Sequence, residues 1–466
     1  MLALVAIVII TFVIYHAEPI LQGRVMETLS TRFRGHVELS AFHVSIAHGF
    51  QVTGAGLKIF GPGDPNAHQP GIQPLIAIEE FRFAAGILNL LHAPMRIHRV
   101  YLKGLELNIP PREQRQQQDG FKGKIKIYVD EFVSEQARLV INTLRSDKLP
   151  IEFDISNLQM KEIGPGQPLL FDATLVNPKP VGAIHSTGLF GPWEADNPRS
   201  SPVRGKYSFR NADLSTIKGI AGILSSNGEY AGTLGNIVVD GETDTPDFQI
   251  AVSGHPVPLH THFHAIVDGT SGDTYLEPVK ARILHSSLVA KGSVLGAKNP
   301  NGHRVVLDVA VLPARIDDLL KLGVRTDPPV TGAAELKTKF DLAPGEAEIS
   351  HRLRLAGTFH ISGAHFTNEK VQAKVDALSM RSQGKPKQAK DDVPDNVLSE
   401  MNGTFKLSEG LLSFLRLHFE VPGTRVDMTG KYSLDGNQFD FHGEARMNAK
   451  SEPHFGLDFR HKAKTE

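Results

Sequence analysis

The chain contains no cysteine. This absence excludes disulfide bonds, thiolate metal sites and cysteine nucleophiles together. It leaves the redox compartment open, because an oxidising compartment tolerates a cysteine-free chain without requiring one. Any chemistry that the protein performs must therefore come from other side chains.

The chain also lacks an excess of charge of either sign. It has 50 Lys and Arg residues against 51 Asp and Glu residues, a formal net charge of -1. This balance gives no electrostatic reason to expect a nucleic-acid partner. With 41% hydrophobic residues in 466, the composition is that of a folded protein, either two to four ordinary domains or one extended array.

Catalytic and cofactor motifs are missing as well. We find no G-x-S-x-G elbow, no P-loop, no H-E-x-x-H and no dinucleotide fingerprint. The paired carboxylates Asp317–Asp318 and Asp391–Asp392 fall at a predicted helix start and in a predicted linker, where the helix dipole and solvent account for them. We therefore expect no enzyme, and we name no catalytic or cofactor-binding residue. A hydrolase on a β-scaffold is the remaining enzymatic alternative.

Two segments resemble metal sites. His260, His262 and His264 alternate, so they face one side of a strand, and imidazole is a common metal ligand. No carboxylate or cysteine lies beside them in the sequence, so an exposed polar face is the favoured interpretation. Residues 268–274 read DGTSGDT, but Val279 stands where a calcium loop of the EF-hand type needs Glu. We predict a hairpin turn there, and no metal site in the chain.

The longest apolar run opens the chain. Residues 1–15 read MLALVAIVIITFVIY without a charge. As a helix this run is roughly 22 Å long, against about 30 Å for a bilayer core, and it can continue through residues 16–18. We predict a membrane anchor over residues 1–17. A cleaved signal peptide and a buried soluble helix are the alternatives, and Tyr15 is bulky for the first of these.

The charges around this run conflict with an exported chain. No Lys or Arg precedes the run, whereas Arg24, Arg32 and Arg34 follow it. The positive-inside rule then places the bulk of the chain in the cytoplasm. Residues upstream of Met1 would remove this conflict.

The next segment, residues 18–35, has the helical period. Pro19 suits a first turn and Gly35 suits a helix end. We predict an amphipathic helix whose apolar positions are Ile20, Leu21, Val25, Met26, Leu29 and Phe33.

A period of two follows Gly35. Residues 96–109 read RIHRVYLKGLELNI, which predicts two stretches of strand around a hinge or bulge at Gly104. Similar runs recur to the end, punctuated by 43 Gly and 29 Pro. The pattern is typical of an antiparallel meander, sandwich or barrel of about 25 strands.

Helices within this β-rich part are predicted to be few and short, over residues 85–91, 212–217 and 314–322. Residues 383–395 read QGKPKQAKDDVPD, which predicts a flexible linker. This linker separates a β-portion over residues 36–382 from a C-terminal meander over residues 396–466 that continues it.

Four blocks carry a family resemblance. Residues 20–60 read ILQGRVMETLSTRFRGHVELSAFHVSIAHGFQVTGAGLKIF, and residues 85–111 read AGILNLLHAPMRIHRVYLKGLELNIPP. Residues 228–252 read GEYAGTLGNIVVDGETDTPDFQIAV, and residues 452–459 read EPHFGLDF. In these blocks the chain resembles the AsmA-like family of bacterial envelope proteins. The matching positions in the first block are Gly35, Gly49, Gly56 and Leu57.

This resemblance implies a fold and a role. The fold would be mainly β: an N-terminal membrane helix, then a long twisted antiparallel sheet curled into a groove, as in bridge-like lipid-transfer proteins. The role would be handling phospholipid for outer-membrane assembly or homeostasis, with an anchor in the inner (cytoplasmic) membrane and the bulk in the periplasm. The implied partners are phospholipid acyl chains, the inner membrane and other envelope proteins.

The physics of such a groove is consistent with this role. A concave apolar face gives each bound methylene about 0.8 kcal/mol relative to water, while a headgroup stays wet at the edge. The alternative is a structural or scaffolding envelope protein, with a filled core and protein partners but no lipid transport. The two differ in whether the apolar face is open.

Overall fold

The computed structural model describes residues 18–19, 22–31, 33, 35–45, 50–61, 73–85, 95–109, 127–142, 151–194, 197–297, 302–384, 396–434, 438–447 and 455–462. The predicted anchor over residues 1–17 lies outside this described part, as do residues 385–395 of the predicted linker and 86–91 of the first predicted short helix. Within the described part, no helix is both long and apolar enough to cross a membrane.

The chain is mainly β, as predicted, and its described residues form 24 strands. The first half comprises β1 (Val37–Glu38), β2 (Ala41–Ser45), β3 (Phe50–Ile59), β4 (Ile76–Ala85), β5 (Met95–Ile109), β6 (Ile127–Ile141), β7 (Ile151–Ile163), β8 (Leu169–Pro178), β9 (Val181–Phe190), β10 (Pro202–Asp213), β11 (Ile220–Ala221) and β12 (Ile223–Thr233). The second half comprises β13 (Asn236–Ile250), β14 (Val257–Val267), β15 (Thr274–Ile283), β16 (Ser286–Ala297), β17 (Gly302–Arg315), β18 (Val330–Leu342), β19 (Leu353–Phe366), β20 (Ser399–Ser408), β21 (Leu411–Val421), β22 (Thr424–Ser433), β23 (Gln438–Met447) and β24 (Phe455–Lys462).

The helices are few. Residues 22–31 are helical near the N-terminus. The others in the described part of the chain are two 3-10 turns, η2 (Pro198–Ser200) and η3 (Leu214–Thr216), and the helices α3 (Ile316–Gly323), α4 (Ile349–Arg352) and α5 (Glu369–Ser382). The helix predicted over residues 314–322 is α3, and the one predicted over 212–217 is only the turn η3. Helix α5 was not predicted.

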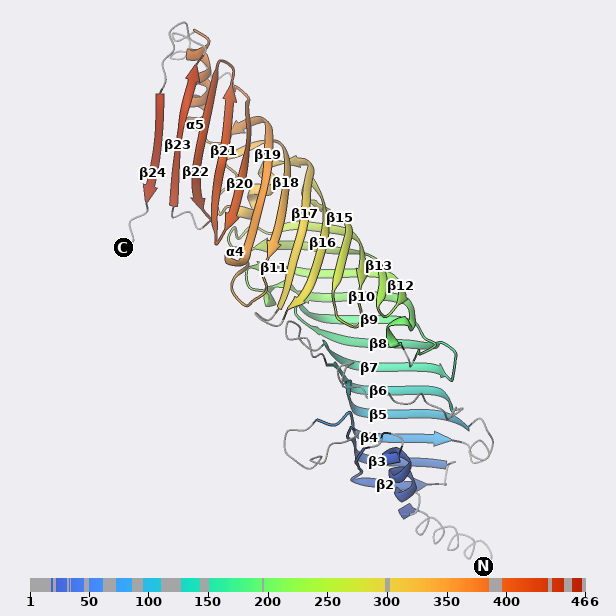
Figure 1. Cartoon of the computed structure of the whole chain (residues 1–466). Helices are drawn as coiled ribbons and strands as arrows, with labels where there is room; N and C mark the ends of the chain where they lie inside the picture. Colours follow the sequence, from blue (N-terminus) through green and yellow to red (C-terminus); the bar gives the residue numbers. More distant parts are fainter. Residues whose placement is uncertain are drawn as a thin grey trace, which may run out of the picture.

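The strands form one long curved sheet in nearly sequential order (Figure 1). Strands β3 to β10 pair each with the next, β10 pairs with β12, and the series continues to β24. Strands β1 and β2 both pair with β3 and form the first edge, while the two-residue β11 pairs with β13. Neighbouring strands are thus mostly neighbours in sequence, as hairpin connections dictate.

One pair of strands contradicts the prediction of a fully antiparallel sheet. Strands β5 and β6 run parallel, with Met95 beside Ile127 and Ile109 beside Ile141. Parallel neighbours cannot be joined by a tight hairpin, because the second strand begins beside the start of the first. The connecting residues 110–126 lie outside the described part.

The alternation of apolar and polar residues along each segment explains why the strands form and which side chains point to which face of the sheet. In β17, Val305, Leu307 and Val309 are half-buried on one face, whereas Arg304 and Asp308 are exposed on the other. The strand registers carry these two faces across the sheet, and we name them the apolar face and the charged face. The apolar face carries Val52, Phe81, Leu102, Phe171, Tyr207, Val239, Phe263, Leu288, Leu307, Phe340, Phe359, Phe405, Phe419 and Val426.

The predicted irregularity in β5 is confirmed. Gly104 has a φ of +61°, which favours glycine because it has no Cβ. A Cβ at this position would lie 2.4 Å from the carboxyl carbon of Glu79 in β4. The strand nevertheless continues through Gly104 and comprises 15 residues, about 50 Å.

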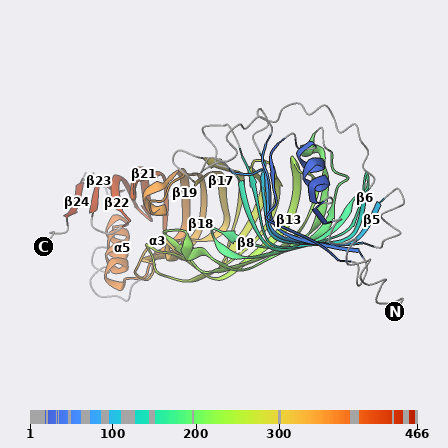
Figure 2. The same cartoon turned by 90° about the horizontal axis from the view of Figure 1, so that it is seen from below.

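Helices cover the apolar face at three places. Met26, Leu29 and Phe33 pack against the buried cluster of β1 to β6, and Figure 2 shows this blue helix inside the curve of the sheet. Ile316, Leu319 and Leu320 of α3 pack against β17 to β19. Helix α5 packs over β21 to β23, where Phe419, Val421, Val426 and Ala445 are buried.

Candidate functional surface

The apolar face between these covers is the candidate functional surface. The three hydrophobic clusters of the described part contain no residue of β8 to β15. Phe171, Val239, Leu259, Phe263 and Leu276 point to this face and are half-buried. Each such side chain still gains about 25 cal/mol per Å² when a ligand removes its remaining contact with water.

At several places on this face an aromatic ring covers a glycine of a neighbouring strand. A Cβ at Gly403 would lie 3.0 Å from the ring of Phe359, and one at Gly430 would lie 2.3 Å from the ring of Phe441. Ring and glycine therefore form a unit in which the ring covers the adjacent backbone, a pairing known to stabilise sheets.

The middle of the surface also carries hydroxyl groups. Tyr207 Oη lies 3.0 Å from Ser226 Oγ, and Tyr230 Oη lies 2.6 Å from Ser186 Oγ. The hydroxyls of Thr243 and Thr261 are 2.6 Å apart in the neighbouring strands. We call these six residues, Ser186, Tyr207, Ser226, Tyr230, Thr243 and Thr261, the hydroxyl cluster.

The hydroxyl cluster was missed by sequence analysis. Its members come from five strands, β9, β10, β12, β13 and β14, which the registers bring side by side. Burial raises the pKa of the Tyr207 and Tyr230 hydroxyls above the ordinary value, so both are neutral phenols at neutral pH. The only signal in the sequence is a polar residue at an inward position of an otherwise apolar strand.

The charged face is held by ion pairs between neighbouring strands. Such pairs at the surface contribute little to stability individually, but they fix which face meets water. Examples are Arg99–Glu131 at 3.1 Å, Lys206–Glu229 at 2.7 Å and Arg304–Asp341 at 2.9 Å.

The three alternating histidines lie on this charged face. His264 pairs with Asp240 at 2.8 Å and His260 with Asp244 at 3.9 Å, while His262 lies opposite Glu242 in the register. The sequence analysis found no carboxylate beside them because these carboxylates belong to the preceding strand. Among the described residues, no three His, Asp or Glu side chains converge as a metal site requires.

A hollow also lies on the charged face. It measures about 820 Å³ and spans β7 to β13, with Lys161, Arg204 and Lys206 among its lining residues. Leu170 and Leu189 lie beside these cations on the same face. Because it faces away from the apolar face, this hollow is not part of the candidate surface.

Residues 268–273 form the turn between β14 and β15, as predicted. Asp268 accepts hydrogen bonds from Thr270 and from the guanidinium of Arg199 at 2.7 Å. Burial alone would raise the pKa of Asp268, but these hydrogen bonds outweigh it and lower the pKa below the ordinary value. The turn is therefore bound to the segment that precedes β10.

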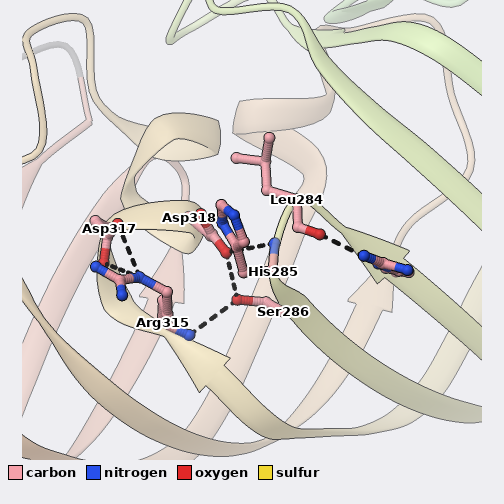
Figure 3. A network of polar contacts seen from close by, with 7 residues as sticks. Leu284, His285, Ser286, Arg315, Asp317 and Asp318 are labelled. Carbon is pink, nitrogen blue, oxygen red and sulfur yellow. Dashed lines mark hydrogen bonds and ion pairs between the residues drawn. The ribbon is translucent and has the colours of Figure 1, made fainter.

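A second polar network fixes α3 at the rim of the sheet (Figure 3). Asp318, in the first turn of α3, accepts hydrogen bonds from the backbone N–H of His285 and from Ser286 Oγ, each at 2.9 Å. The backbone N–H of Arg315 donates to the same Ser286 oxygen. Asp317, the residue before Asp318, instead pairs with the Arg315 side chain at 3.2 Å. The carboxylate pair that the sequence analysis assigned to the helix start thus has two separate structural partners.

Comparison with known proteins adds no relative. No family model, no curated protein and no solved structure matches this chain. The likeness to the AsmA-like family therefore stays a prediction from the sequence.

Proposed function

We propose that this protein handles lipid, with acyl chains lying along the apolar face of β8 to β15. The observation that carries this proposal is the continuity of that face from strand to strand together with its half-buried state between the helical covers. A soluble protein that leaves a contiguous apolar surface uncovered usually presents it to a ligand, a membrane or a partner.

The dimensions suit an acyl chain. Strands follow one another at about 4.8 Å, so β8 to β15 span about 30 Å and the entire sheet about 100 Å along its curve. At about 0.8 kcal/mol per methylene, a chain of a dozen methylenes would gain several kcal/mol even if only partly covered. The charged face stays in water throughout.

The cellular setting is part of the proposal. The apolar run over residues 1–17 would anchor the chain in the inner membrane, and the sheet would lie in the periplasm and serve phospholipid movement for outer-membrane assembly or homeostasis. The support is the run itself and the resemblance to the AsmA-like family. The sheet alone would make a short conduit that works beside a partner.

Photo-crosslinking of the full chain in cells tests the proposal. The photoreactive residue p-benzoylphenylalanine is placed at position 263 or 276 on the apolar face, and at position 275 as the control. Leu276 and Tyr275 are adjacent in β15 but face opposite sides, and Tyr275 is exposed. We expect lipid adducts by mass spectrometry at positions 263 and 276, and none at position 275.

The alternative function is a scaffold that binds other envelope proteins and moves no lipid. The specific observation in its favour is that three helices already cover parts of the apolar face. Protein adducts without lipid at positions 263 and 276 would support this scaffold and refute the lipid proposal.

A further inference from the structure

The hydroxyl cluster lies on the part of the apolar face that belongs to none of the three helix-covered hydrophobic clusters. It occupies β9 to β14 near the middle of the sheet (Figure 1), with Leu, Val and Phe side chains on either side. A hydroxyl in an apolar setting costs free energy unless it finds a hydrogen-bond partner. Six of them within one apolar surface therefore need an explanation.

Packing does not require these hydroxyls. Tyr230 covers Gly205, where a Cβ would lie 2.6 Å from the tyrosine oxygen, and Tyr207 covers Gly228 at 2.8 Å from its ring. Elsewhere on the apolar face the same task is done by phenylalanine, as at Gly403 and Gly430. A phenylalanine at position 207 or 230 would keep the ring carbons that lie 2.8 Å from a Cβ at Gly228 and 2.9 Å from a Cβ at Gly205.

The hydrogen bonds have a definite direction. Ser226 donates its single hydroxyl proton to the carbonyl of Glu242 at 2.8 Å, and Ser186 donates to the carbonyl of Lys206 at 3.1 Å. Since a serine hydroxyl has one proton, Tyr207 donates to Ser226 and Tyr230 donates to Ser186. Both tyrosine oxygens keep acceptor capacity. In the Thr243–Thr261 pair, one hydroxyl donates and the other retains a free donor.

The cluster thus offers two acceptors and one donor, and no charge. A phosphate or carboxylate would want Arg, Lys or several N–H donors, which this patch lacks. A hydroxyl-bearing group, such as the free hydroxyl of a glycerol or a sugar, both donates and accepts and so complements the patch.

We propose that the hydroxyl cluster is a binding subsite for the uncharged, hydroxyl-bearing polar part of an amphiphile whose acyl chains lie on the adjoining apolar face. This inference rests on the proposed lipid-handling function and names the polar chemistry that the surface selects. Tyr207, whose partner Ser226 lies opposite Thr243, accepts the one proton of a ligand hydroxyl, and the Thr243–Thr261 pair donates to the oxygen of that hydroxyl. Tyr230 offers an acceptor to a second hydroxyl.

The test compares three photoreactive probes on the full chain in lipid nanodiscs. The probes are dioctanoylglycerol with a diazirine in one chain, its methyl ether at the free hydroxyl, and a bare alkyl diazirine of similar length. Variants are Tyr207→Phe/Tyr230→Phe, which keeps both rings, and Tyr432→Phe, an inward tyrosine of β22 outside the cluster. The readout is the probe concentration that gives half-maximal labelling of β8 to β15.

We expect dioctanoylglycerol to bind about tenfold more tightly than its methyl ether in the unmodified chain and in Tyr432→Phe. The double variant should lose this preference and still bind the alkyl probe. Equal binding of the glycerol and its ether to the unmodified chain would overturn the subsite and leave the lipid function intact. Labelling of β8 to β15 by none of the three probes would overturn both.

Discussion

The carboxylate of Asp318 accepts a hydrogen bond from the hydroxyl of Ser286 at 2.9 Å, and this contact joins α3 to β16. Asp318 is only 1% exposed, and its carboxylate accepts hydrogen bonds from the Ser286 hydroxyl and the His285 backbone N–H, with the His285 ring 3.6 Å away. The buried Asp318 side chain thereby adds a polar attachment to the apolar packing that holds α3 at the rim of the apolar face.

Asp318→Ala should lower the free energy of unfolding by about 2–4 kcal/mol, because it leaves the Ser286 hydroxyl and the His285 N–H without their acceptor. The neighbouring substitution Asp317→Ala removes a pair with an exposed arginine and should cost less than about 1 kcal/mol. Urea unfolding followed by circular dichroism measures both. Equal losses for the two variants would contradict the assigned role of Asp318.

Gly228→Ala should destabilise the sheet by about 1–3 kcal/mol, because the new methyl group would overpack the site. Its Cβ would lie 2.4 Å from the carbonyl oxygen of Asp240 and 2.8 Å from the Tyr207 ring. Gly296 in β16 has nothing within 4 Å of such a Cβ. Gly296→Ala should therefore be neutral or stabilise by up to about 1 kcal/mol. Thermal melting of the two variants measures the difference in stability. A Gly228→Ala chain as stable as the unmodified chain would refute the close packing of the Tyr207 ring on Gly228.

Val375→Ala and Val371→Ala test whether α5 covers the apolar face. Both residues lie in α5, but Val375 is 9% exposed and Val371 is 41% exposed. We expect a loss of about 1–3 kcal/mol for Val375→Ala and almost none for Val371→Ala, because only the first opens a cavity. Urea titration measures the difference, and similar losses at both sites would place the buried side of α5 elsewhere.

Asp268→Asn should make stability depend less on pH. The lowered pKa of Asp268 means that its carboxylate adds stability above its unfolded pKa of about 3.9, and that this contribution disappears as the pH falls through the lower folded value. The variant should be about 1–2 kcal/mol less stable at pH 7, and the gap should close below the folded pKa.

Urea titrations between pH 7 and pH 2.5 measure that gap. Asp308→Asn, an exposed carboxylate of β17, is the control and should show a gap within about 0.5 kcal/mol of zero throughout. A gap for Asp268→Asn that stays constant down to pH 2.5 would contradict the assigned hydrogen bonds.

The sequence predicted those parts of the fold that depend on local periodicity. The spacing of Ile316, Leu319 and Leu320 identified α3, and the place of Gly104 within an alternating strand indicated a local irregularity there. Helix α5 has a local signal too, since the Asn368 side chain caps its first turn by accepting from the N–H groups of Lys370 and Val371. This helix was overlooked because its buried positions include Gln372 and Asp376, which do not form an apolar stripe.

Features that depend on strand register could not be predicted. The parallel direction of β6 is set by the connection that follows β5, and residues 110–123 of this connection carry no periodic signal in the sequence. The His–Asp pairs and the hydroxyl cluster join side chains of strands whose pairing is known only once the sheet is built. Tyr230 and Ser186, for example, meet although they are far apart in the sequence.

The parallel pair β5–β6 has a consequence for the two long edges of the sheet. Every later step in the series is antiparallel, so β10, β17 and β19 all run in the direction of β5. The segments that follow them, η3, α3 and α5, consequently emerge along one and the same border. Had β6 run the other way, all three would have been displaced to the opposite border. A single reversal of chain direction thus places the two longer helices, α3 and α5, along the margin where β17 and β19 end, whereas the short η2 and α4, which follow β9 and β18, lie along the opposite margin.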